Sequence, residues 1–419
     1  MRFASLEELN DETIGTEVDS ELVDLPENDI IAAGEAGDEA VSIAEGVDAT
    51  SVAADRLEDL AETVEETTAE GGLSDTEAEV VRQAAESLAL IARLPMTAAT
   101  RKMPSTESFG TDKEARIRST KLTAEGFKET ATKWKEAVVS AIKRMIDAIA
   151  KFFDFTGKAA VKLQARAKAL VSSANNVSGT QADKVKSNAA LNDGSKPLTG
   201  DALISSYEKL AALKLFDKAQ LDASTKAIVA LTELTGKGEA ADKEAIRKAF
   251  EATTEALYHG PLKEGAGEVA LPFGGNTLHI DAPKGSDDDF KTRLLGIGGT
   301  KVAIRAAKDA KKVESSEVAP LTSEQVKKLA GAVATHMKTY DDLVTAVKAV
   351  KAASDKAIKE ITSTKDANKT ASSGLRGLTS ALVSGAYGVR GFDVRVSKAA
   401  LDFSDTSLKA YGKKEAAKA

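Results

Sequence analysis

Apolar side chains recur along most of this chain at steps of three and four residues, the spacing that places them on one face of an α-helix. The strongest stripe runs from about residue 118 to 155, where lysines and arginines lie mainly on the other faces. This stretch predicts a basic amphipathic helix. Its apolar positions include Phe127, Trp134, Val138, Ile142, Met145, Ile149, Phe152 and Phe153.

Several other stretches have the same helical period. We expect further helices at about 157–172, 201–216, 218–235, 242–258, 322–350, 378–390 and 392–411. Thr322, followed three residues later by Gln325, forms a capping-box pattern, which marks the start of a helix.

The first part of the chain has a weaker pattern. Residues 1 to about 50 are acidic and rich in glycine, alanine and valine, with little periodicity, and we expect them to be largely unfolded. Apolar residues then keep helical spacing over 51–70, Gly71 and Gly72 stop that helix, and Ser74 with Glu77 forms a second capping box. A small acidic helical hairpin is therefore expected before Pro95.

A β-hairpin gives the clearest strand signal. Two apolar runs, 269–273 and 277–280, flank a glycine-rich turn at 274–276. The expected fold class is therefore mainly α, with helical bundles, one small β-hairpin near 268–281 and a largely disordered acidic leader. The expected divisions are a leader (1–107), a basic amphipathic helical segment (108–172), a linker (173–200), a mostly helical middle domain with the hairpin (201–320) and a C-terminal helical domain (321–419).

Charge divides the chain more sharply than periodicity does. Through Glu107 the sequence holds 27 acidic and 6 basic side chains, a net charge of −21. From Ser108 onward it holds 38 acidic and 51 basic side chains, a net charge of +13. An acidic block joined to a basic one indicates a leader attached to a body that contacts polyanions.

The boundary between the two blocks is a short polar stretch, residues 104–110, with a proline at one end and a glycine at the other. We expect such a stretch to be extended and exposed, which makes it a site of proteolytic cleavage. The predicted processing residues are Ser105, Glu107 and Ser108, with the cut between Glu107 and Ser108.

Nothing in the sequence indicates an active site, a metal site or a cofactor. There is no cysteine, so thiolate chemistry and disulfides are excluded. His259, His279 and His336 are far apart in sequence, without metal-ligand spacing. Gly296–Lys301 lacks the spacing of a phosphate-binding loop and is expected to be a flexible join. We therefore expect a protein that is not an enzyme.

The layout resembles that of the internal head proteins of large tailed bacteriophages. Such chains begin with an acidic leader, which the phage's prohead protease removes after a Glu that has a small or aliphatic residue two positions earlier. Ser105-Thr106-Glu107 fits that pattern, and the segment from Leu122 to Phe153 resembles the start of the mature body. Similar triplets end at Glu35, Glu45, Glu86 and Glu317, but only Glu107 coincides with the charge boundary.

The resemblance implies a structural virion protein inside the capsid, made as a precursor in the host cytoplasm. Its implied partners are the prohead protease, capsid or scaffold proteins and the packaged DNA, contacted weakly and without sequence specificity. Two alternatives stay open. One is an effector that is injected with the DNA and acts on a host protein, and the other is a membrane-active delivery protein.

The membrane alternative depends on the helix at 118–155. A basic amphipathic helix can lie on an anionic membrane, with its apolar stripe in the lipid. The same stripe can instead form the core of a helical bundle, and the other amphipathic segments of the chain favour this interpretation.

Overall fold

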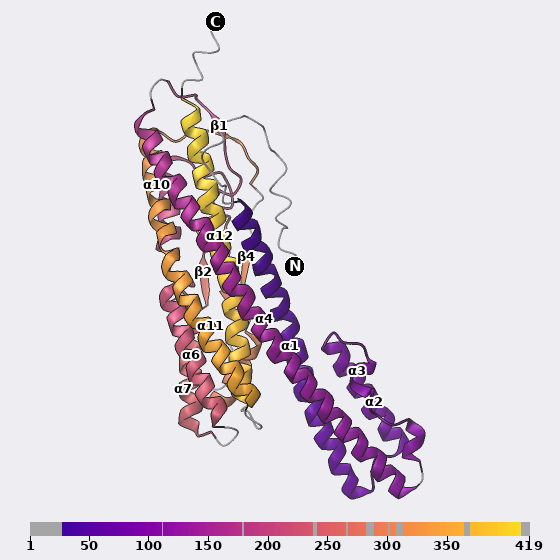
Figure 1. Cartoon of the computed structure of the whole chain (residues 1–419). Helices are drawn as coiled ribbons and strands as arrows, with labels where there is room; N and C mark the ends of the chain where they lie inside the picture. Colours follow the sequence, from indigo (N-terminus) through magenta and orange to yellow (C-terminus); the bar gives the residue numbers. More distant parts are fainter. Residues whose placement is uncertain are drawn as a thin grey trace. The chain divides into compact units, whose positions relative to one another are not determined.

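The protein is built almost entirely of helices, some of them very long (Figure 1). The computed structural model describes residues 27–110, 112–177, 180–237, 241–264, 267–281, 289–300, 302–306, 313–363 and 369–411. The mainly α fold class predicted from the sequence is confirmed.

Most helices follow one another with short connections, and the strands lie in three longer ones. In the first part of the chain they are α1 (Glu27–Glu70), α2 (Asp75–Ile91), α3 (Thr97–Thr100), the 3-10 helix η2 (Thr106–Phe109) and α4 (Lys113–Asn175). In the second part they are α5 (Gly200–Ala212), α6 (Lys218–Gly236), α7 (Lys243–Leu257), α8 (Pro261–Glu264), α9 (Phe290–Gly296), the 3-10 helix η4 (Ile297–Gly299), α10 (Ser323–Lys338), α11 (Tyr340–Ser363) and α12 (Lys369–Lys409). The three longer connections follow α4, α8 and η4. Both predicted capping boxes are present, at α2 and at α10.

The predicted β-hairpin is confirmed and gains a third strand. The antiparallel strands β2 (Glu268–Ala270) and β3 (Asn276–Ile280) are joined by Gly274 and Gly275, whose φ angles of 72° and 60° favour glycine. β4 (Val302–Ala306) pairs with the other edge of β3. A separate two-stranded sheet joins β1 (Val185–Lys186) to β5 (Glu317–Val318).

The chain divides into two compact units, which differ from the divisions drawn from charge and composition. One unit is Val41–Met145; the other combines the residues up to Ala40 with Ile146–Ala419. α1 and α4 each contribute residues to both units. The expected middle and C-terminal domains, 201–320 and 321–419, therefore lie in one unit.

The unit Val41–Met145 has a core built largely from small side chains, with three aromatic residues. Its members before Glu107 are Ala53, Ala54, Leu57, Ala61, Val64, Leu73, Ala78, Ala85, Leu88, Ala89, Ala92 and Ala99. Its members after Glu107 are Phe109, Ala124, Phe127, Ala131 and Trp134. The charge boundary thus falls inside one hydrophobic core.

α12 is the most extensively buried helix of the other unit and packs against α6, α7, α9 and α10. Close contacts explain two of its glycines. A Cβ added at Gly377 would lie 2.0 Å from the Ile297 carbonyl oxygen, and one at Gly385 would lie 1.8 Å from the Phe216 ring. Residues 297–299, expected to be a flexible join, instead form η4 directly against α12.

The expectation of an unfolded segment up to residue 50 is wrong for residues 27–50, which are helical. The buried stripe of this part of α1 is made of Ala33, Ala36, Ala40, Ala44 and Val47, at helical spacing. Four of these five are alanines, so a search for bulky apolar residues missed the pattern. Alanine also has the highest intrinsic helix propensity, which supports the helix locally. Residues 1–26 lie outside the described residues.

Two predicted helix breaks are also wrong. α4 continues without interruption through Gly157. This glycine allows a close approach of α11, since a Cβ there would lie 2.7 Å from a methyl group of Val344. α12 likewise runs through the predicted break near residue 391. In the expected linker, residues 173–175 belong to α4, and residues 180–200 are folded, with Leu191 and Leu198 buried.

Candidate functional site

The charge boundary is exposed but folded. Ser105 and Glu107 are exposed, whereas Phe109 is only 1% exposed and belongs to the core. The Ser108 amide donates to the Ser105 carbonyl over 2.9 Å, which closes the 3-10 turn, and the Ser119 hydroxyl donates to the Ser108 carbonyl over 3.0 Å. The expected extended stretch is therefore a hydrogen-bonded turn anchored by Phe109.

The other triplets of the same type lie in regular secondary structure. Glu35 and Glu45 lie within α1, Glu86 lies within α2, and Glu317 is the first residue of β5. Glu107 lies in a single 3-10 turn between α3 and α4. Because proteases bind extended backbone, less structure must unwind at Glu107 than within a long helix.

The apolar stripe predicted along α4 is buried at all eight positions. Phe127 and Trp134 are 1% and 6% exposed and pack in the unit Val41–Met145. The three C-terminal members, Ile149, Phe152 and Phe153, are buried within the other unit. The stripe is thus hydrophobic core, as the bundle interpretation predicts.

Acidic side chains of α1 pair with basic side chains of α4 within the unit Val41–Met145. Glu58 lies 2.7 Å from the Lys135 ammonium group, and Glu65 pairs with Lys128. The hydrogen bond that Lys128 donates to Glu65 raises the pKa of Lys128. These pairs are largely solvent-accessible, so each contributes little stability and is screened by salt.

A buried contact connects the start of α2 to α4. The Leu73 amide donates to the Thr120 hydroxyl over 2.9 Å. Gly72, with a φ angle of 80°, passes so close to α4 that a Cβ would lie 2.8 Å from backbone atoms of Arg116 and Ile117. The turn between α1 and α2 is therefore fitted against the α4 backbone.

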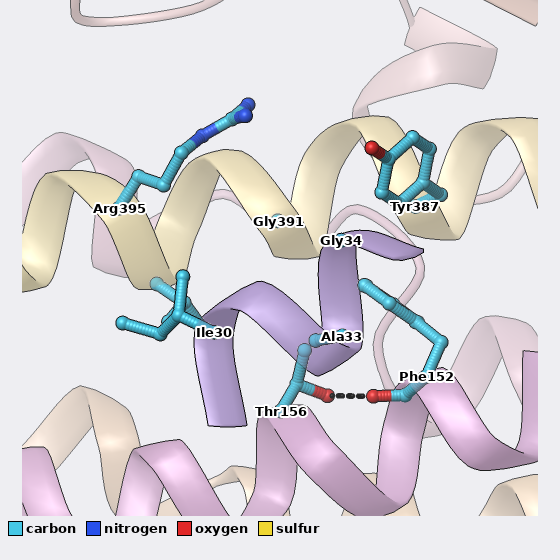
Figure 2. A pocket seen from close by; sticks show the side chains of 9 residues that line it. Ile30, Ala33, Gly34, Phe152, Thr156, Tyr387, Gly391 and Arg395 are labelled. Carbon is cyan, nitrogen blue, oxygen red and sulfur yellow. Dashed lines mark hydrogen bonds between the residues drawn. The ribbon is translucent and has the colours of Figure 1, made fainter. Parts of the chain in front are cut away.

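In the other unit, the first residues of α1 lie between α4 and α12, around a small hollow (Figure 2). Ile30, Ala33 and Gly34 face Phe152 across it, and Tyr387 and Arg395 come from α12. At Gly37, an added Cβ would lie 2.0 Å from the Tyr387 ring. The hollow holds no charged cluster and indicates close helix packing rather than a ligand site.

Polar contacts hold the same part of α1 in place. Asp29 pairs with Lys162 of α4 at 2.8 Å, and Glu27 pairs with Lys398 of α12 at 3.3 Å. The Tyr387 hydroxyl donates to Asp38 over 2.6 Å. Burial, and then the hydrogen bond to Asp38, raise the pKa of Tyr387.

A buried polar cluster in the unit that contains Ile146–Ala419 was not predicted from the sequence. Arg390 and Asp393 of α12, both almost fully buried, pair at 2.8 Å. The Tyr340 hydroxyl lies 3.4 Å from Asp393, and the Tyr207 hydroxyl lies 3.3 Å from His336 Nδ1. In the sequence, Arg390 and Asp393 are polar residues at helical spacing within α12, a pattern that resembles an exposed helix face.

The cluster holds the loop between α5 and α6. Arg390 donates to the Leu215 carbonyl over 2.6 Å and to the Phe216 carbonyl over 3.4 Å, between α5 and α6. Burial lowers the pKa of His336 despite the nearby Asp393, because Arg390 already balances that carboxylate. The cluster therefore has a packing role, because it joins α12 to the loop between α5 and α6.

The three histidines lie on different elements with different carboxylate neighbours. His259 follows α7 beside Glu255, His279 lies on β3 beside Glu268, and His336 lies on α10. The described residues include no group of three or more histidine, aspartate or glutamate side chains that could hold a metal ion. Among the described helices, none has the length and hydropathy required to cross a membrane.

Comparison with known proteins identifies the family. No curated protein and no solved structure matches this chain. A family model of phiKZ-like phage internal head proteins matches residues 27–405, beginning at the first residue of α1 and ending within α12. The chain therefore belongs to the phiKZ-like phage internal head proteins and has a structural role inside the phage capsid.

Proposed function

We propose that this head protein is made as a precursor, cut between Glu107 and Ser108 by the prohead protease, and stored beside the genome as a basic protein. One observation carries the proposal: the net charge changes from −21 to +13 at an exposed turn that matches the protease's sequence preference. The precursor's net charge of −8 opposes early binding to nucleic acid.

The processing step is tested on particles. Mass spectrometry of the protein from native phage heads is expected to give Ser108 as the N-terminus. A phage carrying Glu107→Ala is expected to contain an uncut chain or one cut elsewhere. A wild-type N-terminus at Met1 or Arg2 would exclude processing.

Weak contact with DNA is the second part of the proposal. Residues 108–419 carry 51 basic side chains, and each phosphate they neutralise releases counterions, which favours binding. The sequence has no basic patch interleaved with aromatic residues, so binding is expected to be independent of base sequence.

Binding is tested by gel shift with duplex DNA. Processed protein that has been separated from its leader is expected to bind with micromolar or weaker affinity and to lose most of that affinity between about 50 and 200 mM salt. The uncut precursor is expected to bind less well, because its leader repels the duplex and pairs with basic side chains. Binding that is absent at 50 mM salt, or equal for both forms, would exclude this part.

The injected effector and the membrane-active protein receive no support from a specific observation. The α4 stripe that motivated the membrane interpretation is buried at all eight positions. The leading proposal therefore stands without a second candidate.

A further inference from the structure

The cut at Glu107 opens the backbone inside a folded unit. Twelve of the seventeen core residues in the unit Val41–Met145 come before the cut, and five come after it. The five include Phe109, Phe127 and Trp134, which pack with alanine and leucine side chains of α1 and α2. A single hydrolysed peptide bond leaves all of these contacts in place.

The two sides of this core also match in charge. Residues 41–107 carry 14 acidic and 5 basic side chains, and residues 108–145 carry 5 acidic and 9 basic ones. Glu58–Lys135 and Glu65–Lys128 place opposite charges beside the apolar seam. Such an arrangement favours this helix pair over pairing of two basic α4 faces.

The first residues of the leader are held independently. Ala33, Ala36 and Ala40 are buried, and Gly37 lies directly against the Tyr387 ring. Asp29, Glu27 and Asp38 are each paired, as described above. The described leader is therefore attached within both units, at sites far apart in its sequence.

We propose that one cut between Glu107 and Ser108 does not release the leader, because Phe109 of η2 and the α4 residues Phe127, Trp134, Lys128 and Lys135 form a binding site for an acidic amphipathic helix, occupied by residues 41–107. The inference rests on the proposed processing. If the proposal holds, cleavage of the peptide bond does not by itself change the net charge from −8 to +13. The basic surface becomes free only when the leader dissociates.

The test uses the full-length chain with a cleavable loop. A flexible loop that contains the recognition sequence of a site-specific protease is inserted between Glu107 and Ser108. After complete cleavage, the product is analysed by size-exclusion chromatography at 0.1 and 1 M NaCl, and the two fragments are quantified in each peak. We expect them to co-elute at a 1:1 ratio at both salt concentrations, because the core is apolar.

Trp134 reports on the same interface. It is the chain's single tryptophan and is 6% exposed. We expect its emission maximum to be unchanged by cleavage and to shift to the red once denaturant separates the fragments. Separate elution at either salt concentration, or a red shift on cleavage alone, would overturn the proposal.

Two substitutions in α1 locate the contact. Leu57→Asp places a charge in the core, and at least a tenfold weaker association of the cut fragments is expected. Val52→Asp changes an exposed side chain of the same helix and is expected to leave association unchanged. Circular dichroism of the uncut variants shows whether each folds. The wild-type experiment decides the proposal even if Leu57→Asp does not fold.

This experiment is independent of the phage protease. If the native N-terminus is not Ser108 but the engineered fragments co-elute, the proposed processing fails and the binding site stands. If the native N-terminus is Ser108 but the engineered fragments separate, the processing stands and the binding site fails.

Discussion

The two compact units differ in how they depend on the acidic leader. The unit Val41–Met145 takes most of its hydrophobic core from residues before Glu107. The other unit takes only residues up to Ala40 from that part of the chain, and its core is built mainly by the C-terminal half of α4 and by helices α5–α7 and α10–α12. The same cut would therefore divide one core and leave the other nearly complete.

The cores also differ in chemistry. The leader-dependent core is apolar, and its ion pairs lie near the surface. The other unit buries the pair Arg390–Asp393 among tyrosine and histidine side chains. A surface ion pair is separated at low cost, whereas a buried one strongly penalises loss of a partner. The leader part of the unit Val41–Met145 is thus held mainly by apolar packing, with ion pairs near the surface.

The largest expected effect is that of Asp393→Ala in the leader-independent unit. Removal of this carboxylate leaves the Arg390 guanidinium group buried without a counter-charge, and about 3–5 kcal/mol of unfolding free energy is expected to be lost. Hydrogen exchange should accelerate in α10 and α12, but not in α2.

Asp405→Ala is the matched control in the same helix. Asp405 pairs with Lys409 at 2.9 Å in a solvent-accessible position, so a loss below about 0.5 kcal/mol is expected. Equal effects of the two substitutions would show that burial of Asp393 is not important for stability.

The next effect is that of Leu57→Ala in the leader-dependent unit. Leu57 is fully buried, and truncation of such a leucine costs about 2–5 kcal/mol. Faster hydrogen exchange is expected in α2 and in the first half of α4, while α10 and α12 stay protected. Val52→Ala, at a position 40% exposed, is expected to change neither region. Faster exchange throughout the chain would contradict independent cores.

A smaller effect is expected from pH at His336. Burial lowers the pKa of His336 from its ordinary value of 6.5, so below pH 6.5 the unfolded chain binds a proton that the folded chain does not. Stability contributed by the neutral histidine is therefore present above pH 6.5 and is lost as pH falls, by at most about 1.4 kcal/mol per pH unit.

Denaturant unfolding at pH 7.5, 6.5 and 5.5 measures this dependence. His336→Gln is expected to flatten this pH dependence. An unchanged slope for His336→Gln would assign the pH dependence to other groups.

The smallest effects are expected at the surface ion pairs of the leader. Glu58→Gln and Glu65→Gln should each cost about 0.2–1 kcal/mol at low salt and less at 1 M salt. Thermal unfolding at the two salt concentrations measures the difference. A salt-independent loss would contradict a screened electrostatic contact.

Much of the helical layout could be predicted from the sequence because large apolar side chains mark a helix face clearly. The stripe from Phe127 to Phe153, both capping boxes and the β-hairpin were found in this way. The same search did not detect stripes of alanine, and it therefore missed the first half of α1. Gly157 was misleading because it permits close packing within a continuous helix, whereas a glycine in a sequence is usually taken as a helix end.

The candidate site was predicted less completely than the fold. Charge and the Ser-x-Glu triplet located the boundary, but neither indicates that Phe109 is buried two residues after the cut. The polar cluster around Arg390 depends on α5, α10 and α12, which are distant in sequence. Single-sequence periodicity has no information about such contacts.

The anchoring of Phe109 has a consequence for chemical labelling. Cleavage before Ser108 would create an α-amine beside a hydroxyl group, an amino alcohol that periodate converts into an aldehyde. Because the Ser119 hydroxyl holds the Ser108 carbonyl and Phe109 is buried, this group would stay next to α4 instead of lying at the end of a loose tail. Each processed copy in a phage head would thus carry one reactive handle at a defined position, suitable for counting copies or for attaching a distance probe.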